Sequence, residues 1–597
     1  MLLLLLACDG SPKNTESLDA PGIDDSRADP GDDNTDTVDT PPPDADADGS
    51  PAGEDCDETD ASVFPGAPER CDGVDQDCDG AADDGVPSDG AGCQDPGSPL
   101  FPDVVGTIQV VLETADEEYA DSSDDLGVCL GEWCATLDIA DWDDRERANF
   151  DVHTFEGVGI PRSELQGLEL YVIEGSNRWQ PGGVAVSFDG EGVYSRVLVD
   201  LYLGTEGGDE VDRWSDSLGI YDDSIWPSAL THGPIQGAPF ADGARVWFRT
   251  DRTRRVELRV AATAEALATA TPIAVRYPAV EHDFTETIEV FGLGSRAEWA
   301  YDLVVDGQAQ GPWTLPPGPV DGTPGVRRIA FGSCTKDDEQ PLFADIRAEA
   351  PDLFLFVGDN HYGDTDELDA LRQQYRWAHS REHRAELMYE AGVYATWDDH
   401  DYVGNNTDGS ASGKDVALRS FKEFWANGRY GTETVPGVFS AHTYGDLGIY
   451  LLDDRYHRED DETLLGLDQE AWLLASIVAS DAVFKLVVTG SQWNLDGSSD
   501  SWANFPEAQE RVVDALSAAP GVVLLSGDIH TSEIVGVPAE HYQLPELTSS
   551  PLGYGGVGKV IYIDVDTTVA DPTLVARIVD VDGDELGRLE LVRSELE

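Results

Sequence analysis

The sequence predicts a multidomain protein in which β-sandwich modules precede a carboxyl-terminal α/β domain. Its 597 residues suffice for about three or four domains. Up to about residue 322, short runs alternate apolar and polar residues, which is typical of half-buried strands. Beyond residue 325, fully apolar runs alternate with helical segments and end in residues that can bind metal, and this alternation indicates an α/β sheet.

The chain is strongly acidic, with 118 Asp and Glu residues against 37 Lys and Arg residues and a formal net charge of −81. A nucleic-acid-binding protein needs basic surface to neutralise phosphates, so we exclude that class. Hydrophobic residues make up 40% of the chain, which is enough for packed cores and argues against general disorder. We expect a monomer.

Residues 1–8 read MLLLLLAC and resemble the end of a bacterial lipoprotein signal. The resemblance implies an exported protein, at the cell envelope or outer surface or secreted, whose Cys8 carries a lipid anchor, although the basic start of such a signal is missing. The run is too short to span a membrane, and no later segment reaches 18 consecutive apolar residues. Residues 9–52 are acidic and Pro-rich, so we expect a disordered linker.

Residues 53–95 hold four cysteines among dense carboxylates, in the phrases DCDETD, PGAPE and CDGVDQDCDG. They resemble the MopE-type metal-binding repeats of exported bacterial proteins, which implies Ca²⁺ binding by carboxylates on Gly-rich turns. The alternative is a disulfide-stapled acidic spacer. Export would permit disulfides, and we expect Cys129 and Cys134 to close a small loop. Cys334 is then left over, inside the strongest motif of the chain.

Two β-rich modules follow. Residues 100–228 resemble a PLAT-type β-sandwich, which implies contact with lipid or protein, and the alternative is a purely structural sandwich. Residues 229–323 contain the phrases THGPIQG, ARVWFRT and EWAYDLVVDG. These phrases are similar to the fibronectin-like lead domain of PhoD-like (alkaline phosphatase D) enzymes, so we expect an immunoglobulin-like sandwich.

Residues 324–597 carry chemically reactive side chains directly after their apolar strands. The motifs, in order, are FGSC, FLFVGDNHYGDT, TWDDHDY, LLDDRYHR, LGLDQEAWL, KLVVTGSQ and LSGDIH. Open α/β sheets build their sites beyond the carboxyl ends of the strands, so we expect these residues to converge there. In order and spacing the seven motifs resemble the PhoD-like family.

That resemblance implies a four-layer, calcineurin-like metallophosphatase fold that hydrolyses phosphodiesters or phosphomonoesters by attack of metal-activated hydroxide on phosphorus. Fe³⁺ and Ca²⁺ are the expected ions, with Zn, Mn or Mg as alternatives. Asp359 would bridge the ions and take part in catalysis. The implied metal ligands are Cys334, Asp359, Tyr362, Asp399, Asn405, Asp528 and His530.

The chemistry of these residues suits the implied ions. Fe³⁺ is hard and highly charged, so it binds phenol and thiol as anions, whereas Ca²⁺ prefers carboxylates. His400 would contact substrate as a proton donor or transition-state stabiliser. Arg455 would be catalytic and, with Arg458, would bind substrate; the alternative is that both arginines pair with carboxylates of the LLDDRYHR motif.

Three residues beside the expected centre depart from the family pattern, namely His361, Val403 and Asn406. The departures at His361 and Val403, together with the accessory modules, motivate a second hypothesis, a cell-surface adhesion or Ca²⁺-binding protein whose phosphatase-like domain is inactive. A third hypothesis, a phosphodiesterase directed at phospholipids, rests on the PLAT-like module and the lipid anchor.

Overall fold

The computed structural model describes residues 104–115, 125–139, 142, 149–174, 179–198, 201–204, 211–219, 228–294, 298–337, 340–459, 462–494 and 500–597. The predictions for the signal, the linker and the cysteine-rich acidic module, Cys8 included, lie outside these residues. Within them, no helix combines the length and the apolar composition that a membrane crossing requires.

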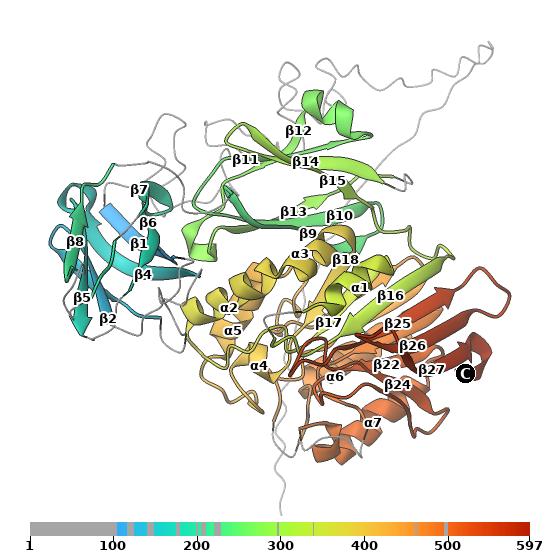
Figure 1. Ribbon diagram of the computed structural model, residues 1–597. Coiled ribbons are helices and arrows are strands. Elements are labelled where there is room, and N and C mark those ends of the chain that lie inside the picture. The colour runs from blue at the N-terminus through green and yellow to red at the C-terminus, as the bar shows by residue number, and fades with distance from the viewer. Residues whose placement is uncertain are drawn as a thin grey trace, which may run out of the picture. The chain divides into compact units, whose positions relative to one another are not determined.

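The first described module consists of two four-stranded antiparallel sheets, ordered β4-β1-β6-β7 and β3-β2-β5-β8 (Figure 1). Their side chains share one core, because alternate residues of a strand point to the same face. The strands are β1 (Val104–Thr114), β2 (Asp125–Leu130), β3 (Trp133–Leu137), β4 (Phe150–Pro161), β5 (Leu168–Glu174), β6 (Pro181–Phe188), β7 (Glu191–Val197) and β8 (Arg213–Asp216).

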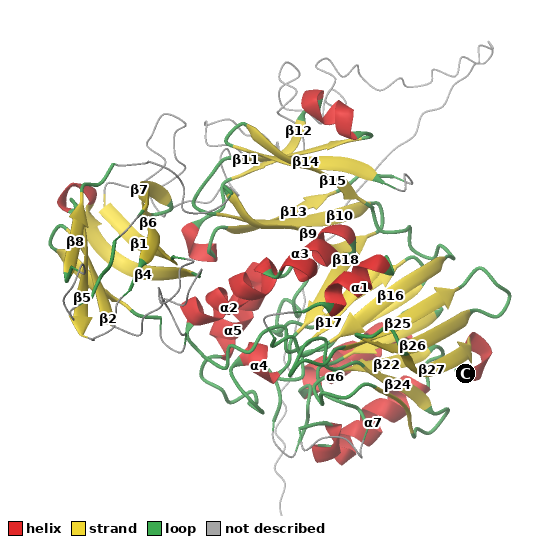
Figure 2. Ribbon diagram, in the orientation of Figure 1, coloured by secondary structure: helices red, strands yellow, loops and turns green. Residues whose placement is uncertain are grey.

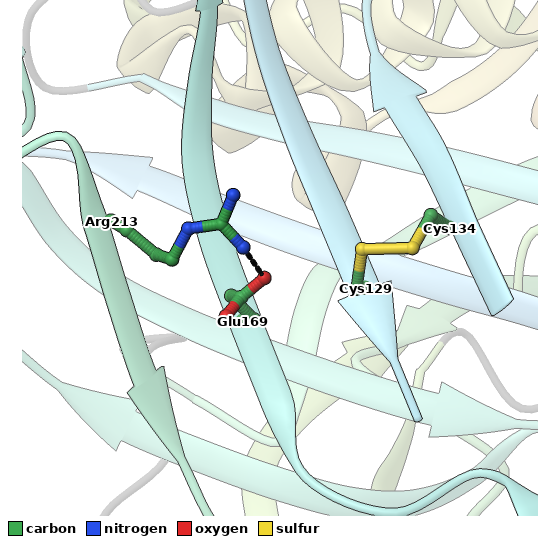
Figure 3. The surroundings of a disulfide bond; sticks show 4 residues. All are labelled: Cys129, Cys134, Glu169 and Arg213. Atoms are coloured by element: carbon green, nitrogen blue, oxygen red, sulfur yellow. Dashed lines mark hydrogen bonds and ion pairs between the residues drawn. A yellow bond between two sulfur atoms is a disulfide. The ribbon is translucent and has the colours of Figure 1, made fainter. Parts of the chain in front are cut away.

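A disulfide joins the β2–β3 hairpin of this module, as the sequence predicts. Cys129 and Cys134 are direct partners in the antiparallel register, with Cα atoms 4.1 Å apart (Figure 3). Nearby, Arg213 of β8 forms an ion pair with Glu169 of β5 (Figure 3). The two contacts link neighbouring strands of one sheet.

The second module has a three-stranded sheet, β13-β10-β9, and a four-stranded sheet, β12-β11-β14-β15. Its core is built from buried side chains of both sheets. The strands are β9 (Leu230–Phe240), β10 (Gly243–Thr250), β11 (Val256–Ala261), β12 (Pro272–Arg276), β13 (Thr285–Val290), β14 (Trp299–Val305) and β15 (Gln308–Leu315).

The α/β domain contains two six-stranded sheets. The first is ordered β18-β17-β16-β25-β26-β27 and the second β19-β20-β21-β22-β24-β23. The first sheet consists of β16 (Val326–Gly332), β17 (Leu353–Val357), β18 (Gly392–Thr396), β25 (Lys559–Asp566), β26 (Thr573–Asp580) and β27 (Glu585–Val592). The second consists of β19 (Ser440–Tyr444), β20 (Leu447–Leu451), β21 (Phe484–Val488), β22 (Val522–Ser526), β23 (Glu533–Val537) and β24 (Leu544–Thr548).

The helices of this domain lie beside its sheets (Figure 2), and apolar side chains fill the contacts between them. One core joins the first sheet to α1, α2, α3 and α5, and another joins the second sheet to α6 and α7. A third core holds side chains of both sheets and so lies between them. The helices are α1 (Leu342–Ala348), α2 (Leu368–Ser380), α3 (Glu382–Glu390), α4 (Asp399–Tyr402), α5 (Lys414–Phe424), α6 (Leu467–Val478) and α7 (Pro506–Ser517).

Buried polar contacts fix the second module to the α/β domain. The indole N–H of Trp247 on β10 donates to the carbonyl of Glu423 on α5, at 2.7 Å. Asp283 accepts from Arg249 of its own module at 2.9 Å and from Arg376 of α2 at 2.7 Å. The two guanidinium groups hold the pKa of the buried Asp283 carboxyl well below its usual range, although burial opposes this shift.

Candidate metal centre

The site is built at the carboxyl ends of strands from both sheets. In the first sheet, β16, β17 and β18 run parallel, so their carboxyl ends lie at one edge. Cys334, Asp359 and Asp399 follow these three strands in order. Asp528 follows β22 of the second sheet, and its carbonyl lies 3.4 Å from the Cys334 sulfur. The strand ends of the two sheets therefore meet, as the motif order predicts.

Four site residues have left-handed backbone conformations that ordinary side chains rarely adopt. The φ angles are +62° for Cys334, +52° for Asp359, +67° for Asp528 and +52° for His530. Such conformations cost of order 1–3 kcal/mol each and concentrate at functional sites. Next to Asp359, Gly358 has φ of +94°, and a Cβ there would lie 2.5 Å from the Cβ of Asp398. The sharp turns after these strands bring the side chains together.

The first group of potential metal ligands contains Cys334, Asp359 and His530, whose ligand atoms all lie within 4.8 Å of one another. The Cys334 thiol donates to Asp359 Oδ2 at 3.3 Å. The Tyr362 hydroxyl donates to the same Oδ2 at 3.2 Å and lies 3.3 Å from His530 Nε2. One sulfur, one carboxylate, one phenol and one imidazole thus surround a common point.

The second group contains Asp359, Asp399 and His400, again within 4.8 Å of one another. Asp399 Oδ2 accepts the backbone N–H of Asn406 at 2.7 Å, while Asp399 Oδ1 is buried with no hydrogen-bond partner. Asp359 Oδ1 is likewise buried with no partner. Asp359 belongs to both groups, so its two oxygens can serve two different ions.

These donors fit metal ions for an electrostatic reason. Burial and the neighbouring carboxylates of Asp399, Asp401 and Asp528 raise the pKa of Asp359 well above its usual range. Burial also raises the pKa of the Cys334 thiol and of the Tyr362 phenol, with Asp359 adding to both shifts. Bare carboxylate oxygens buried together in this way are costly unless a cation neutralises them. Cations at both groups would satisfy the two unpaired oxygens.

His400 lies beside this centre with one ring nitrogen already engaged. Its Nδ1 lies 2.6 Å from Asp364 Oδ1, and its ring lies 4.2 Å from that of Tyr362. Burial lowers the pKa of His400, but the hydrogen bond to Asp364 and the charge of Asp399 outweigh it, and the net shift is upward. Asp364 orients the ring, which leaves Nε2 as the nitrogen that can meet a ligand.

The structure places Arg455 and Arg458 differently from the sequence-based expectation of substrate binding. Arg455 is fully buried, and its guanidinium binds Asp398 at 2.6 Å and Asp500 at 2.7 Å. Arg458 is also buried and pairs with Asp500. The Arg455 guanidinium is therefore held by carboxylates, whereas Nε and one terminal nitrogen of Arg458 are buried with no hydrogen-bond partner. The partners are mostly distant in sequence, which the LLDDRYHR motif alone does not reveal.

Two of the expected metal ligands, Asn405 and Asp528, lie outside the two groups of potential ligands found among the described residues. Asn405 is exposed, and the neighbouring Asn406, with φ of +58°, is the residue whose backbone contacts Asp399. The side-chain amide of Asn406, oriented to donate, lies 3.3 Å from Asp399 Oδ2. Asp528 is half-buried and close enough to raise the pKa of Asp359, but its carboxylate is in neither group found among the described residues.

The other two departures from the family pattern do not remove a donor. His361 is fully buried, packs edge-on against Tyr375 and accepts the backbone N–H of Gly363 through Nδ1. Burial and the charge of Arg384 lower the pKa of His361, so the ring is neutral. Val403 packs against the apolar core beneath the first sheet.

Several residues that support the site were not singled out from the sequence. Asp401 accepts the backbone N–H of Asp398 at 2.7 Å and that of Asn360 at 3.0 Å, so it joins the loops after β17 and β18. Ser550 donates to the Cys334 sulfur at 3.1 Å. Tyr554 stacks on His530 with ring centres 4.0 Å apart. The last two follow β24, whose sequence LPELT has a glutamate in its middle and so lacks the fully apolar run that marks the other strands.

This arrangement defines a class: an α/β domain that gathers a thiol, a phenol, imidazoles and carboxylates for a cluster of metal ions. The sequence model of the PhoD-like phosphatases matches residues 329–577. The match agrees with the resemblance that the seven motifs of residues 324–597 indicate. Residues 55–84 match the model of the Cu-binding MopE metal-binding motif.

Individual relatives agree with the family match. Alkaline phosphatase D of Bacillus subtilis (strain 168) is 26% identical, and the match covers 34% of this chain and 46% of that protein. The chain thus spans less than half of this curated relative. A solved structure of PhoD aligns with a TM-score of 0.52 at 17% identity and covers 62% of this chain and 90% of that one. That alignment supports the fold.

Proposed function

We propose that the protein is a metal-dependent hydrolase of phosphoric esters with a binuclear centre in a four-layer metallophosphatase domain. The observation that carries the proposal is the position of Asp359. It belongs to both groups of potential ligands and has one buried oxygen without a hydrogen-bond partner. A shared carboxylate is what two neighbouring ions require, and two such ions can clamp a phosphoryl group.

The two groups differ in chemistry, which supports two different ions. Cys334, Tyr362 and His530 offer sulfur, phenol and imidazole on one side of Asp359, a set that suits a transition metal such as Fe³⁺. Asp399 offers carboxylate oxygen on the other side, which suits a hard cation such as Ca²⁺. Ions of this kind, when bound, supply Lewis acidity and a hydroxide near neutral pH.

Within this proposal His400 acts as a proton donor toward the leaving oxygen. Its Nδ1 is fixed by Asp364 at 2.6 Å, so the ring is oriented with Nε2 available. The raised pKa of His400 keeps the ring protonated at a higher pH than an isolated histidine. Asp401 holds the loops that carry Asp359 and Asp399.

The test replaces Asp359 with asparagine, which keeps the shape and removes the charge. We expect the Asp359→Asn protein to bind fewer metal ions and to lose at least about a hundredfold in turnover of an aryl phosphodiester and an aryl phosphomonoester, since even groups that only support ligands are worth 10–100-fold. Asp582→Asn, at an exposed turn after β26, is the matched control and should leave both readouts unchanged.

Metal analysis by mass spectrometry and a phosphoester panel give the two readouts. A wild-type protein that carries metal but turns over no ester would overturn the proposal and favour a binding protein with an inactive phosphatase-like domain. Full activity in Asp359→Asn would show that the centre described here is not the site of reaction.

We also propose that the protein is exported and anchored through a lipid on Cys8. The support is the sequence of residues 1–8 together with the Cys129–Cys134 disulfide, because disulfides persist in oxidising compartments. Metabolic labelling with a fatty acid in bacteria that express the full chain tests this. Label on the wild type and none on Cys8→Ser is expected, whereas an unlabelled wild type in the cytosolic fraction would overturn it.

A further inference from the structure

Lys336 is an exposed cation beside the metal centre that the family resemblance does not assign. Its ammonium group lies 4.9 Å from the ring centre of Tyr362 and 5.4 Å from that of Tyr554. Tyr362 contacts Asp359 and His530, and Tyr554 stacks on His530. Two aromatic rings of the site thus hold the lysine head at its edge.

Hydrogen bonds anchor the backbone at Lys336 and at the neighbouring Asp337, so the chain segment that carries the lysine has a defined position. The backbone N–H of Lys336 donates to the carbonyl of Gly553 at 2.8 Å. Asp337 accepts the backbone N–H groups of Gly555 and Gly556, both at 2.9 Å. These bonds tie the loop after β16 to the loop that carries Tyr554.

Lys336 differs from the other cations expected near the substrate in having no carboxylate partner among the described residues. Arg455 and Arg458, the other cations expected near the substrate, are buried against Asp398 and Asp500. Within the described part of the chain, no carboxylate forms an ion pair with Lys336. Among the described residues, an approaching phosphate ester therefore meets at this edge a lysine that forms no ion pair with a carboxylate.

We infer that Lys336 binds an anionic oxygen of the substrate phosphoryl group, at the edge of the centre formed by Tyr362 and Tyr554. This inference rests on the proposed function and names a substrate contact of the same site. The ammonium group supplies a point charge with three donors, which suits a phosphate oxygen. The tyrosine rings hold the ammonium group in place, and no carboxylate of the described residues competes for it.

Binding of inorganic phosphate to the metal-loaded protein tests the contact without depending on turnover. We expect Lys336→Met to weaken phosphate binding, measured by calorimetry, about tenfold, because a hydrogen bond to a charged group is typically worth this factor or more. Lys336→Arg keeps the charge and should stay within about threefold of wild type.

Lys422→Met is the matched control. Lys422 is an exposed lysine of α5, and its ammonium group lies 5.8 Å from the ring centre of Tyr430. The substitution therefore removes the same charge from the same kind of environment as Lys336→Met. We expect its phosphate affinity and its KM for a phosphomonoester to equal those of wild type, whereas Lys336→Met should raise KM with phosphate affinity lost in parallel.

The outcomes separate the two proposals. Equal phosphate affinity in wild type and Lys336→Met, or an equal loss in Lys422→Met, would overturn the lysine contact while ester hydrolysis still stands. A wild type that binds phosphate and loses it in Lys336→Met, but hydrolyses no ester, would overturn the proposed function and leave the contact intact. A metal-loaded wild type without phosphate affinity would overturn the lysine contact, whereas the proposed function is decided by ester turnover.

Discussion

Glu546, in the middle of β24, is a buried carboxyl group of the second sheet that forms no ion pair with a described residue. Its Oε1 accepts the hydroxyl of Ser526 at 2.7 Å and the backbone N–H of Trp493 at 2.8 Å, while its Oε2 has no partner. Burial raises the pKa of this carboxyl from 4.5 to about 7. The folded protein therefore holds a proton on Glu546 that the unfolded chain releases at lower pH.

This difference predicts how stability depends on pH. Between pH 4.5 and 7 the folded state binds more protons at Glu546 than the unfolded state, so the free energy of unfolding falls as pH rises through that window and levels off above it. A pKa moved from 4.5 to about 7 corresponds to about 3 kcal/mol, at 1.36 kcal/mol for each tenfold change in proton affinity.

Glu546→Gln removes the titrating group and keeps an oxygen for Ser526 and Trp493. We expect the variant to gain about 2–3 kcal/mol relative to wild type on going from pH 5 to pH 8. Urea unfolding at each pH, with a chelator to remove metal linkage, measures the difference.

The matched control is Glu540→Gln, at an exposed position in the connection before β24. Its stability relative to wild type should not change with pH. If the difference between Glu546→Gln and wild type were the same at pH 5 and pH 8, Glu546 would titrate alike in both states, and the inference that burial holds its proton would be refuted.

Three further predictions concern the site and its supports. Arg455→Met should lower the free energy of unfolding by about 3–5 kcal/mol, because Asp398 and Asp500 would keep buried charges without a partner. Urea unfolding measures this loss, with the exposed Arg588→Met as the control. Equal small losses in the two variants would contradict the prediction. Asp364→Asn should lower the pKa of His400, because the hydrogen bond to Asp364 raises that pKa. The alkaline limb of the kcat/KM–pH profile should then move to lower pH, since the ring loses its proton earlier. An unmoved limb would exclude His400 as the group that titrates. Replacing Cys129 and Cys134 together by serine should cost about 2 kcal/mol, given the short loop that they close, and should leave phosphoesterase activity unchanged; an activity loss at full stability would contradict a purely structural role.

The sequence was most informative where strand and ligand are neighbours in the chain. Two buried five-residue strands of the first sheet's parallel part are followed within three residues by a reactive side chain, namely Asp359 after β17 and Asp399 after β18. The apolar run identifies the strand, and parallel strands bring their carboxyl ends to one edge. The position of the site at these strand ends and most of its donors could therefore be read from the motifs.

Sequence reasoning was weaker wherever a role depends on a partner far along the chain. The LLDDRYHR motif did not reveal that Arg455 is buried against Asp398 and Asp500, because those carboxylates come from other loops. The family resemblance implied Asn405 as a ligand, whereas the structure shows that the backbone N–H of Asn406 donates to Asp399.

The sequence by itself determined the order of strands and reactive residues, because local apolar patterning and the residue that follows are both properties of a short segment. Only the tertiary structure decided that Asp359 is shared by two groups of donors and that Arg455 and Arg458 are buried and paired with Asp500. It alone also placed Lys336 and Tyr554 beside the candidate metal centre. These facts follow from how two sheets pack and where their loops meet, and such contacts join residues that are hundreds of positions apart.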